Sequence, residues 1–168
     1  MQVFKSFVFY CLVFSVFKIS AQQGFMAGLG PTYDFNNNAI GVNSRLYYGP
    51  TEVFCFGPEV SFFPYQQIDD QYEASILDLN LNAHYIFELS HKIGVYPLSG
   101  LNYTIEKERL VNESNPDEEK EIGLNYGLGA HYNLGKFFAF IEFKGIIGKL
   151  SDEFVTVGVI FNLSNKKE

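Results

Sequence analysis

Five charged side chains stand at alternate positions within otherwise apolar segments: Arg45, Glu59, Asp78, Glu142 and Lys144. Glu142 and Lys144 are two residues apart, so in a strand both side chains point to one face. A charge buried away from water must find a partner or cost several kcal/mol. Opposite charges on one shared face therefore predict either a network of salt bridges or a narrow path for ions.

Residues that could act as nucleophiles or metal ligands are also present, but their spacing in the sequence matches no catalytic or metal-binding motif. The candidates are Ser61, Ser75, Ser99, Cys55, His84, His91 and His131. None of the serines has a histidine in a partnering position. His84 and His131, on the strands predicted at 74–88 and 122–134, do not make the three or four ligands of a metal site. We expect no catalytic residue, no cofactor and no metal. A lipid-modifying barrel enzyme remains the enzymatic alternative.

The charge balance is acidic. The chain of 168 residues carries 19 Asp and Glu against 12 Lys and Arg, for a formal net charge of −7. Nucleic-acid binding needs clustered Lys and Arg against phosphates, so a nucleic-acid partner is not expected. Charged residues make up only 18% of the chain, below the roughly 25% of a typical soluble domain.

The first 21 residues have the pattern of a signal peptide. Lys5 precedes an apolar run from Ser6 to Phe17, and Ala21 offers a small residue for cleavage. Lys18 interrupts the apolar run too early for a membrane-spanning helix of about 20 residues. We therefore expect an exported protein with one domain over residues 22–168.

The dominant hydrophobic period of that domain is two, which is typical of strands. Between Ile122 and Leu134, apolar residues alternate with glycine, asparagine and histidine, and a helix would scatter them around its surface. The same alternation predicts eight strands, at about 24–35, 40–48, 53–63, 74–88, 92–106, 122–134, 136–148 and 153–163. Pro31, Pro58 and Pro97 fall inside these strands, where they predict bulges or local breaks because proline cannot donate to the ladder.

Short and longer connections alternate between these strands. Tight turns near 49–52, 89–91 and 135 alternate with connections near 36–38, 66–71, 107–120 and 149–153. Short turns at one end and longer loops at the other are typical of outer-membrane barrels. The polar face is rich in glycine and asparagine, which suits a narrow barrel interior better than an exposed surface.

These patterns predict an all-β fold, an eight-stranded antiparallel up-and-down transmembrane β-barrel whose apolar face meets lipid. The five charged residues then share the interior, which in eight strands is just wide enough for side chains, so a salt-bridge plug is favoured over an ion path. A soluble lipocalin-like carrier of a hydrophobic ligand, with its apolar face turned inward, is the alternative from another class.

Two segments resemble a known family. The segment from Tyr96 to Tyr103 is similar to the central strand of the outer-membrane β-barrel family common in Bacteroidota, and the segment from Val157 to Leu163 resembles its last strand. The resemblance implies a small barrel of the OmpA/OmpX kind in the outer membrane of a Gram-negative cell. It also implies contact with outer-membrane lipid and lipopolysaccharide and insertion by the barrel assembly machinery.

The segment from Lys107 to Glu121 is the most polar part of the domain, with six acidic and three basic residues. It predicts a solvated loop outside the cell, with a protein partner as its functional interpretation. The expected role is structural or one of surface interaction without catalysis. The alternative within the same fold is a narrow channel or an accessory part of an envelope transport or secretion assembly.

Overall fold

The computed structural model describes residues 24–67, 71–111 and 115–163, so the predicted signal peptide 1–21 lies outside the described residues. Its strands are β1 (Gly24–Asp34), β2 (Ala39–Gly49), β3 (Phe54–Gln67), β4 (Tyr72–Tyr85), β5 (Phe87–Glu88), β6 (Ile93–Leu110), β7 (Asp117–Asn133), β8 (Phe137–Ile147) and β9 (Glu153–Asn162). β5 is a two-residue strand that follows β4 after an interruption at Ile86 and, like β4, pairs with β6. No helix among the described residues is long and apolar enough to cross a membrane.

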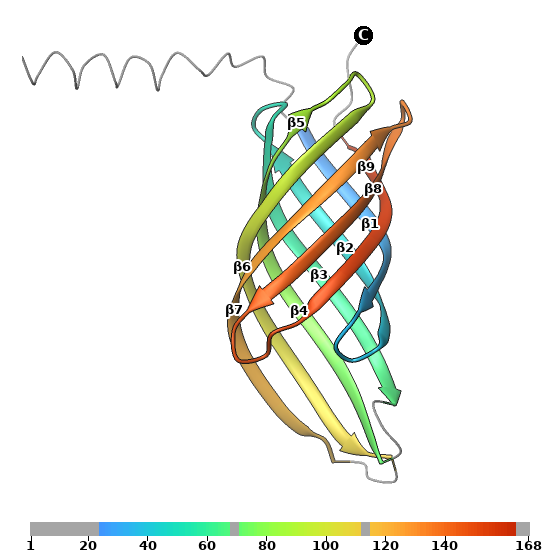
Figure 1. Ribbon diagram of the computed structural model, residues 1–168, viewed down its shortest axis with the longest axis vertical. Coiled ribbons are helices and arrows are strands. Elements are labelled where there is room, and N and C mark those ends of the chain that lie inside the picture. Colours follow the sequence, from blue (N-terminus) through green and yellow to red (C-terminus); the bar gives the residue numbers. More distant parts are fainter. Residues whose placement is uncertain (1–23, 68–70, 112–114, 164–168) are drawn as a thin grey trace, which may run out of the picture.

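The strands form one closed antiparallel sheet. Consecutive strands pair with each other except β4 and β5, β1 pairs with β9, and the pairing of β4 with β6 completes the ring. When β4 and β5 are counted as one interrupted strand, the sheet has eight strands. The predicted eight-stranded up-and-down barrel is confirmed (Figure 1). Both ends of the described chain and the short connections lie at one end of the barrel, here called the turn end, and the opposite end is the loop end (Figure 1).

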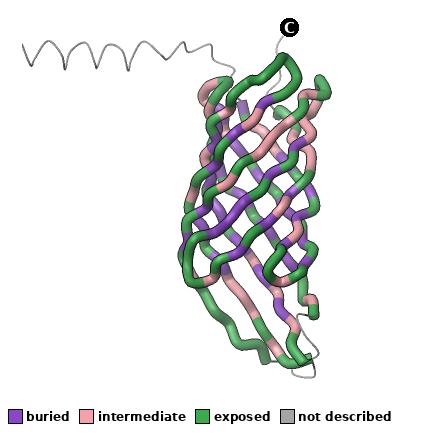
Figure 2. The backbone as a smooth tube through the Cα atoms, viewed as in Figure 1, coloured by how far each residue is buried: buried purple, intermediate pink, exposed green. Residues whose placement is uncertain are grey.

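Outward and inward residues alternate along much of the barrel wall, so that exposed and buried positions follow one another in most strands (Figure 2). Large apolar side chains cover the outside, among them Leu29, Ile40, Leu81, Leu101, Leu128 and Ile141, each more than half exposed. The buried residues include Asn43, Asn82, Asn102, Asn125, Thr104 and Thr156. An apolar outside around a polar inside is the facing of a membrane barrel and the inverse of a soluble carrier, so the lipocalin-like alternative is not retained.

The three prolines sit where pairing lapses on one side of the strand, as predicted. The ladder is interrupted between β1 and β9 at Pro31, between β2 and β3 at Pro58, and between β4 and β6 at Pro97. At Pro58 the preceding Gly57 allows a close approach, because a Cβ there would overlap the carbonyl oxygen of Leu46. Proline removes a backbone donor and glycine removes a side chain. At each proline, one ladder of the strand is therefore interrupted while the ladder on its other side continues.

The strand ends near the loop end differ from the prediction. β3, β4, β6 and β7 run past the β1–β2 and β8–β9 connections and extend from the barrel rim (Figure 1). We call residues 63–67, 72–76, 105–110 and 117–121 of these strands the protruding sheet. The predicted loop from Lys107 to Glu121 is therefore wrong for most of its length, since Lys107 pairs with Glu118 and Glu108 with Asp117 in a β-ladder. Cross-strand ion pairs support strand pairing in a segment whose charge alone indicated a loop.

Candidate functional site

Arg45 and Glu142 form the centre of the barrel interior. Both side chains are fully buried, and the guanidinium donates two hydrogen bonds to the carboxylate, from Nη1 to Oε2 at 2.9 Å and from Nη2 to Oε1 at 3.1 Å. The residues come from β2 and β8, which are separated in the sheet by β1 and β9. This bidentate geometry is the strongest form of an arginine–carboxylate pair, and it ties two walls of the barrel together across the lumen.

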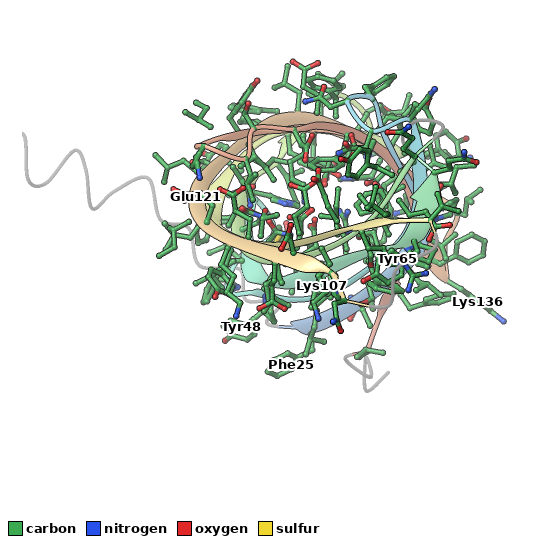
Figure 3. The ribbon with its side chains drawn as sticks, turned by 90° about the horizontal axis from the view of Figure 1, so that it is seen from below. Phe25, Tyr48, Tyr65, Lys107, Glu121 and Lys136 are labelled. Carbon is green, nitrogen blue, oxygen red and sulfur yellow. The ribbon has the colours of Figure 1, made fainter. Side chains whose placement is uncertain are left out.

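Glu59 and Lys144 extend the pair into a four-membered network. Lys144 Nζ donates to Glu59 Oε1 at 2.6 Å, and Arg45 Nη2 lies 3.5 Å from Glu59 Oε2. Arg45 and Glu59 face each other in the register of β2 and β3. Two cations and two carboxylates thus neutralise one another inside the barrel, into which many side chains project (Figure 3). We call Arg45, Glu59, Glu142 and Lys144 the lumen network.

Neutral side chains satisfy the remaining acceptors of the lumen network. The hydroxyl of Tyr47 donates to Glu59 Oε2 at 2.8 Å, and the hydroxyl of Tyr96 donates to Glu142 Oε2 at 3.0 Å. Asn82 Nδ2 donates to Glu59 at 3.2 Å. The two tyrosines were not among the predicted site residues, although their position on the polar face of strands with apolar outer faces was the available signal.

Asp78, the fifth predicted residue, is buried but does not join the lumen network. Thr104 Oγ1 and Asn102 Nδ2 donate to its Oδ1 at 2.6 and 3.2 Å. Its Oδ2 has no hydrogen-bond partner among the described residues. The structure therefore brings together four of the five predicted residues and leaves Asp78 with neutral partners one strand away from Glu59.

An apolar cluster closes the lumen nearer the loop end. Its members are Ala39, Phe63, Ile76, Ile146 and Phe154, each buried. The rings of Phe63 and Phe154 stack with centroids 5.5 Å apart, and Lys144 Nζ lies 5.5 Å from the centroid of Phe154. The cluster follows directly on the lumen network, so charge and hydrocarbon together fill this part of the interior.

The turn end of the lumen is hollow. A cavity of about 800 Å³ opens there, and its lining includes Cys55, His84, Tyr96 and His131. His84 stacks on Tyr96 with ring centroids 4.7 Å apart and lies 3.9 Å from Glu142, so the lumen network borders the cavity. Within the described residues, no group of three or more His, Cys, Asp or Glu could hold a metal ion.

The candidate serines lie in unrelated places. Ser61 Oγ accepts a hydrogen bond from Asn43, Ser75 Oγ donates to the carbonyl oxygen of Phe63, and Ser99 is exposed on the outside of the barrel. The partners recorded for Ser61 and Ser75 are an amide and a backbone carbonyl, neither of which would activate a nucleophile.

Asp152 lies in the connection between β8 and β9, outside the strands, and is buried near other carboxylates. Burial first, and then the charges of Asp34, Asp78 and Glu106, raise the pKa of Asp152 from 3.8 to about 8. The folded protein therefore holds this proton more tightly than the unfolded chain does. It follows that this group favours folding at low pH, and that this stabilisation is lost as pH rises through about 8.

We predict that the free energy of unfolding of the wild type decreases between about pH 4 and about pH 8. In the Asp152→Asn variant this decrease should be much smaller. The check is the midpoint of urea unfolding in detergent micelles, measured for both proteins across this range. Glu52→Gln, at the turn end, is the matched control and should keep the wild-type pH dependence. Parallel pH profiles for the wild type and Asp152→Asn would contradict the prediction.

Known proteins share this architecture. The family model described as the outer membrane protein beta-barrel domain matches residues 13–152. The barrel resembles the N-terminal β-barrel domain of Pseudomonas aeruginosa OprF (TM-score 0.63, 19% identity, covering 84% of this chain and 98% of that one). It also resembles Ail, the attachment invasion locus protein of Yersinia pestis (TM-score 0.58, 12% identity, 84% and 99% covered). A third is a major outer membrane protein from Thermus thermophilus (TM-score 0.60, 12% identity, 85% and 100% covered).

No curated protein matches the chain. At these identities the solved structures establish the fold, whereas the family model spans most of the chain. The family and the fold both point to the outer membrane, in agreement with the apolar outer surface. The chain belongs to the outer membrane protein β-barrel domain family.

Proposed function

We propose that this protein is a non-catalytic outer-membrane barrel with a closed lumen, which holds the protruding sheet outside the cell as a surface for interaction. The observation that carries the proposal is the extension of β3, β4, β6 and β7 beyond the rim, on a barrel whose lumen contains the lumen network and the apolar cluster. Short turns of bacterial barrels face the periplasm, which puts the protruding sheet on the extracellular side.

Several finer features belong to the same proposal. Residues 1–21 serve as a signal peptide, the barrel assembly machinery inserts the chain, and the outer surface contacts lipid and lipopolysaccharide. The segments Tyr96–Tyr103 and Val157–Leu163 support an origin in Bacteroidota. The name of Ail, the attachment invasion locus protein, is consistent with a surface-interaction role, although the likeness itself is one of fold.

A narrow channel is the second candidate function, and the hollow turn end favours it. The two functions differ in what the lumen network does. In the closed barrel that we propose, the bidentate pair and the apolar side chains beside it block the path of water, whereas a channel needs the same groups to separate.

We predict no single-channel steps when the purified wild-type barrel is reconstituted in a planar lipid bilayer. The matched variant is Glu142→Ala, which removes the acceptor of Arg45 and should raise conductance if the network is the barrier. Steady ion-selective conductance of the wild type would contradict the closed lumen and support the channel.

The interaction role is tested by removing the hairpin that β6 and β7 contribute to the protruding sheet. In the shortened variant, Asn-Gly replaces residues 106–119, so that the pair Ile105–Lys120 closes a tight turn. Cells that display the wild type should adhere to a panel of immobilised extracellular proteins and polysaccharides more strongly than cells that display the shortened variant. Equal adhesion, with both barrels folded as judged by heat-modifiable migration on a gel, would contradict the proposed function.

A further inference from the structure

One edge of the protruding sheet has no neighbouring strand. β7 pairs with β6 from Asp117 onward, but its pairing with β8 begins at Leu124, opposite Ile147. The β8–β9 connection reaches Ile122, since a Cβ on Gly148 would lie 3.5 Å from the Ile122 carbonyl oxygen. Within the described residues, the outer edge of Asp117–Glu121 has no strand beside it, so alternate backbone N–H and C=O groups there face outward.

The opposite edge of the same sheet, on β3, lies beside the end of β2. The pairing of β2 with β3 ends at Val42 and Phe62. Beyond this point the side chain of Gln66 links β3 to the end of β2: its Oε1 accepts from the backbone N–H of Ile40 and its Nε2 donates to the Ile40 carbonyl oxygen, both at 2.7 Å. A register shift between Phe63 and Gln66 further disturbs this edge. The two edges are therefore unlike, and the one on β7 is the better template for an added strand.

The two faces beside the β7 edge carry different charge. On one face Glu118 lies 3.2 Å from Lys107 Nζ and 2.5 Å from Lys120 Nζ, so its charge is compensated. On the other face Glu119 stands opposite Glu106, and Asp117 stands opposite Glu108. Like charges directly opposite in a ladder destabilise it. This second face is thus an acidic surface that a cation would stabilise.

Lys149 shows how a cation reaches that acidic surface. It belongs to the β8–β9 connection and forms an ion pair with Glu119. It thus approaches from the side on which β8 lies, which is where an added strand would continue the sheet. A second copy of this chain would bring the same acidic edge and be repelled, so the charge selects a basic strand and rejects self-pairing.

We propose, building on the proposed surface-interaction function, that the edge Asp117–Glu121 receives an extended basic segment of another protein by strand addition. The backbone of the edge supplies the hydrogen bonds, and alternate Lys or Arg side chains of the partner meet Asp117, Glu119, Glu106 and Glu108. Strand addition combines a sequence-independent backbone ladder with selection by alternate side chains.

The first test uses the full-length barrel in lipid nanodiscs and a synthetic peptide in which lysine alternates with threonine or valine. We expect saturable binding, lost when glutamate replaces lysine and lost when alternate peptide nitrogens are methylated. In the protein, Glu108→Lys combined with Glu119→Lys should weaken binding by at least about tenfold. Glu118→Gln, on the other face of the same strand, is the matched control and should bind as the wild type does.

The second test probes the backbone edge. Neighbouring residues of a strand direct their N–H groups to opposite sides, so one of Glu119→Pro and Lys120→Pro removes an outward donor and leaves the pairing with β6 intact. We expect that variant to keep a heat-modifiable barrel and to lose peptide binding. Equal binding of the methylated and unmethylated peptides, absence of binding to the wild type, or self-association of the wild type through this edge would each overturn strand addition.

The adhesion experiment separates this inference from the proposed function. If the shortened variant loses adhesion while the folded proline variant keeps it, the protruding sheet is an interaction surface but strand addition is wrong. If both variants adhere as the wild type does, both the inference and the proposed function fail. Loss of adhesion in both variants supports both.

Discussion

Replacing Arg45 by methionine is expected to lower the free energy of unfolding by about 3–5 kcal/mol. The substitution removes the partner of Glu142 and one of the cations near Glu59, while the methionine keeps most of the side-chain volume. A carboxylate left buried without its cation pays a desolvation cost that the hydrogen bond from Tyr96 alone cannot offset. The measurement is equilibrium urea unfolding of the barrel in detergent or in lipid vesicles.

Arg109→Met is the matched control, because Arg109 pairs with Glu73 at 3.0 Å while both side chains remain partly exposed. A partly solvated pair contributes little, so we expect a loss of about 1 kcal/mol or less. The double variant Arg45→Met with Glu142→Leu should recover part of the lost free energy of unfolding, because the carboxylate that Arg45 neutralised is removed as well. A change within about 1 kcal/mol for Arg45→Met would show that water enters the lumen and solvates the network.

Replacing Leu128 by arginine is expected to lower the free energy of unfolding in lipid by about 2–4 kcal/mol. Leu128 is 67% exposed on the outside of the barrel and lies midway along the part of β7 that pairs with strands on both sides. An outward charge there faces the centre of the hydrocarbon layer, where its desolvation is most costly. Glutamate at Leu79, Leu128 or Ile141 should likewise impair membrane insertion.

The matched control for this second prediction is Leu134→Arg. Leu134 is also exposed, but it follows β7 at the turn end, where a long cationic side chain reaches water. We expect a loss of about 0–1 kcal/mol for that variant. Equal effects of arginine at Leu128 and Leu134 in lipid, or wild-type stability of Leu128→Arg, would contradict the membrane facing. The measurement is urea unfolding in lipid vesicles, with the fraction of folded barrel read from unboiled gels.

Local pattern was enough to predict the strands and their faces. Alternate side chains point to opposite faces of any strand, whatever it pairs with, so the period of two around Leu124, Tyr126 and Leu128 indicated both the strand and its outer face. Proline lacks the same donor in every context, so Pro31, Pro58 and Pro97 predicted the interrupted ladders that the structure contains.

The charged segment between Lys107 and Glu121 shows where local pattern misled. A run of charges that avoids burial is usually a loop, and the composition of the segment contained no contrary signal. The structure pairs its two halves as a hairpin, with Lys107 against Glu118, because an exposed strand can be stabilised by cross-strand ion pairs instead of a buried face.

Fold class, the inward or outward facing of each strand and the presence of opposite charges inside the barrel all follow from the amino-acid sequence. Tertiary structure alone decided which charges meet: Glu142 joins Arg45 across the lumen from 97 residues away, while Asp78 stays with Asn102 and Thr104. The protruding sheet and its open edge could also be seen only in the tertiary structure. The physical reason is that facing follows from the geometry of one strand, whereas register, closure and strand length depend on pairing between segments far apart in the chain.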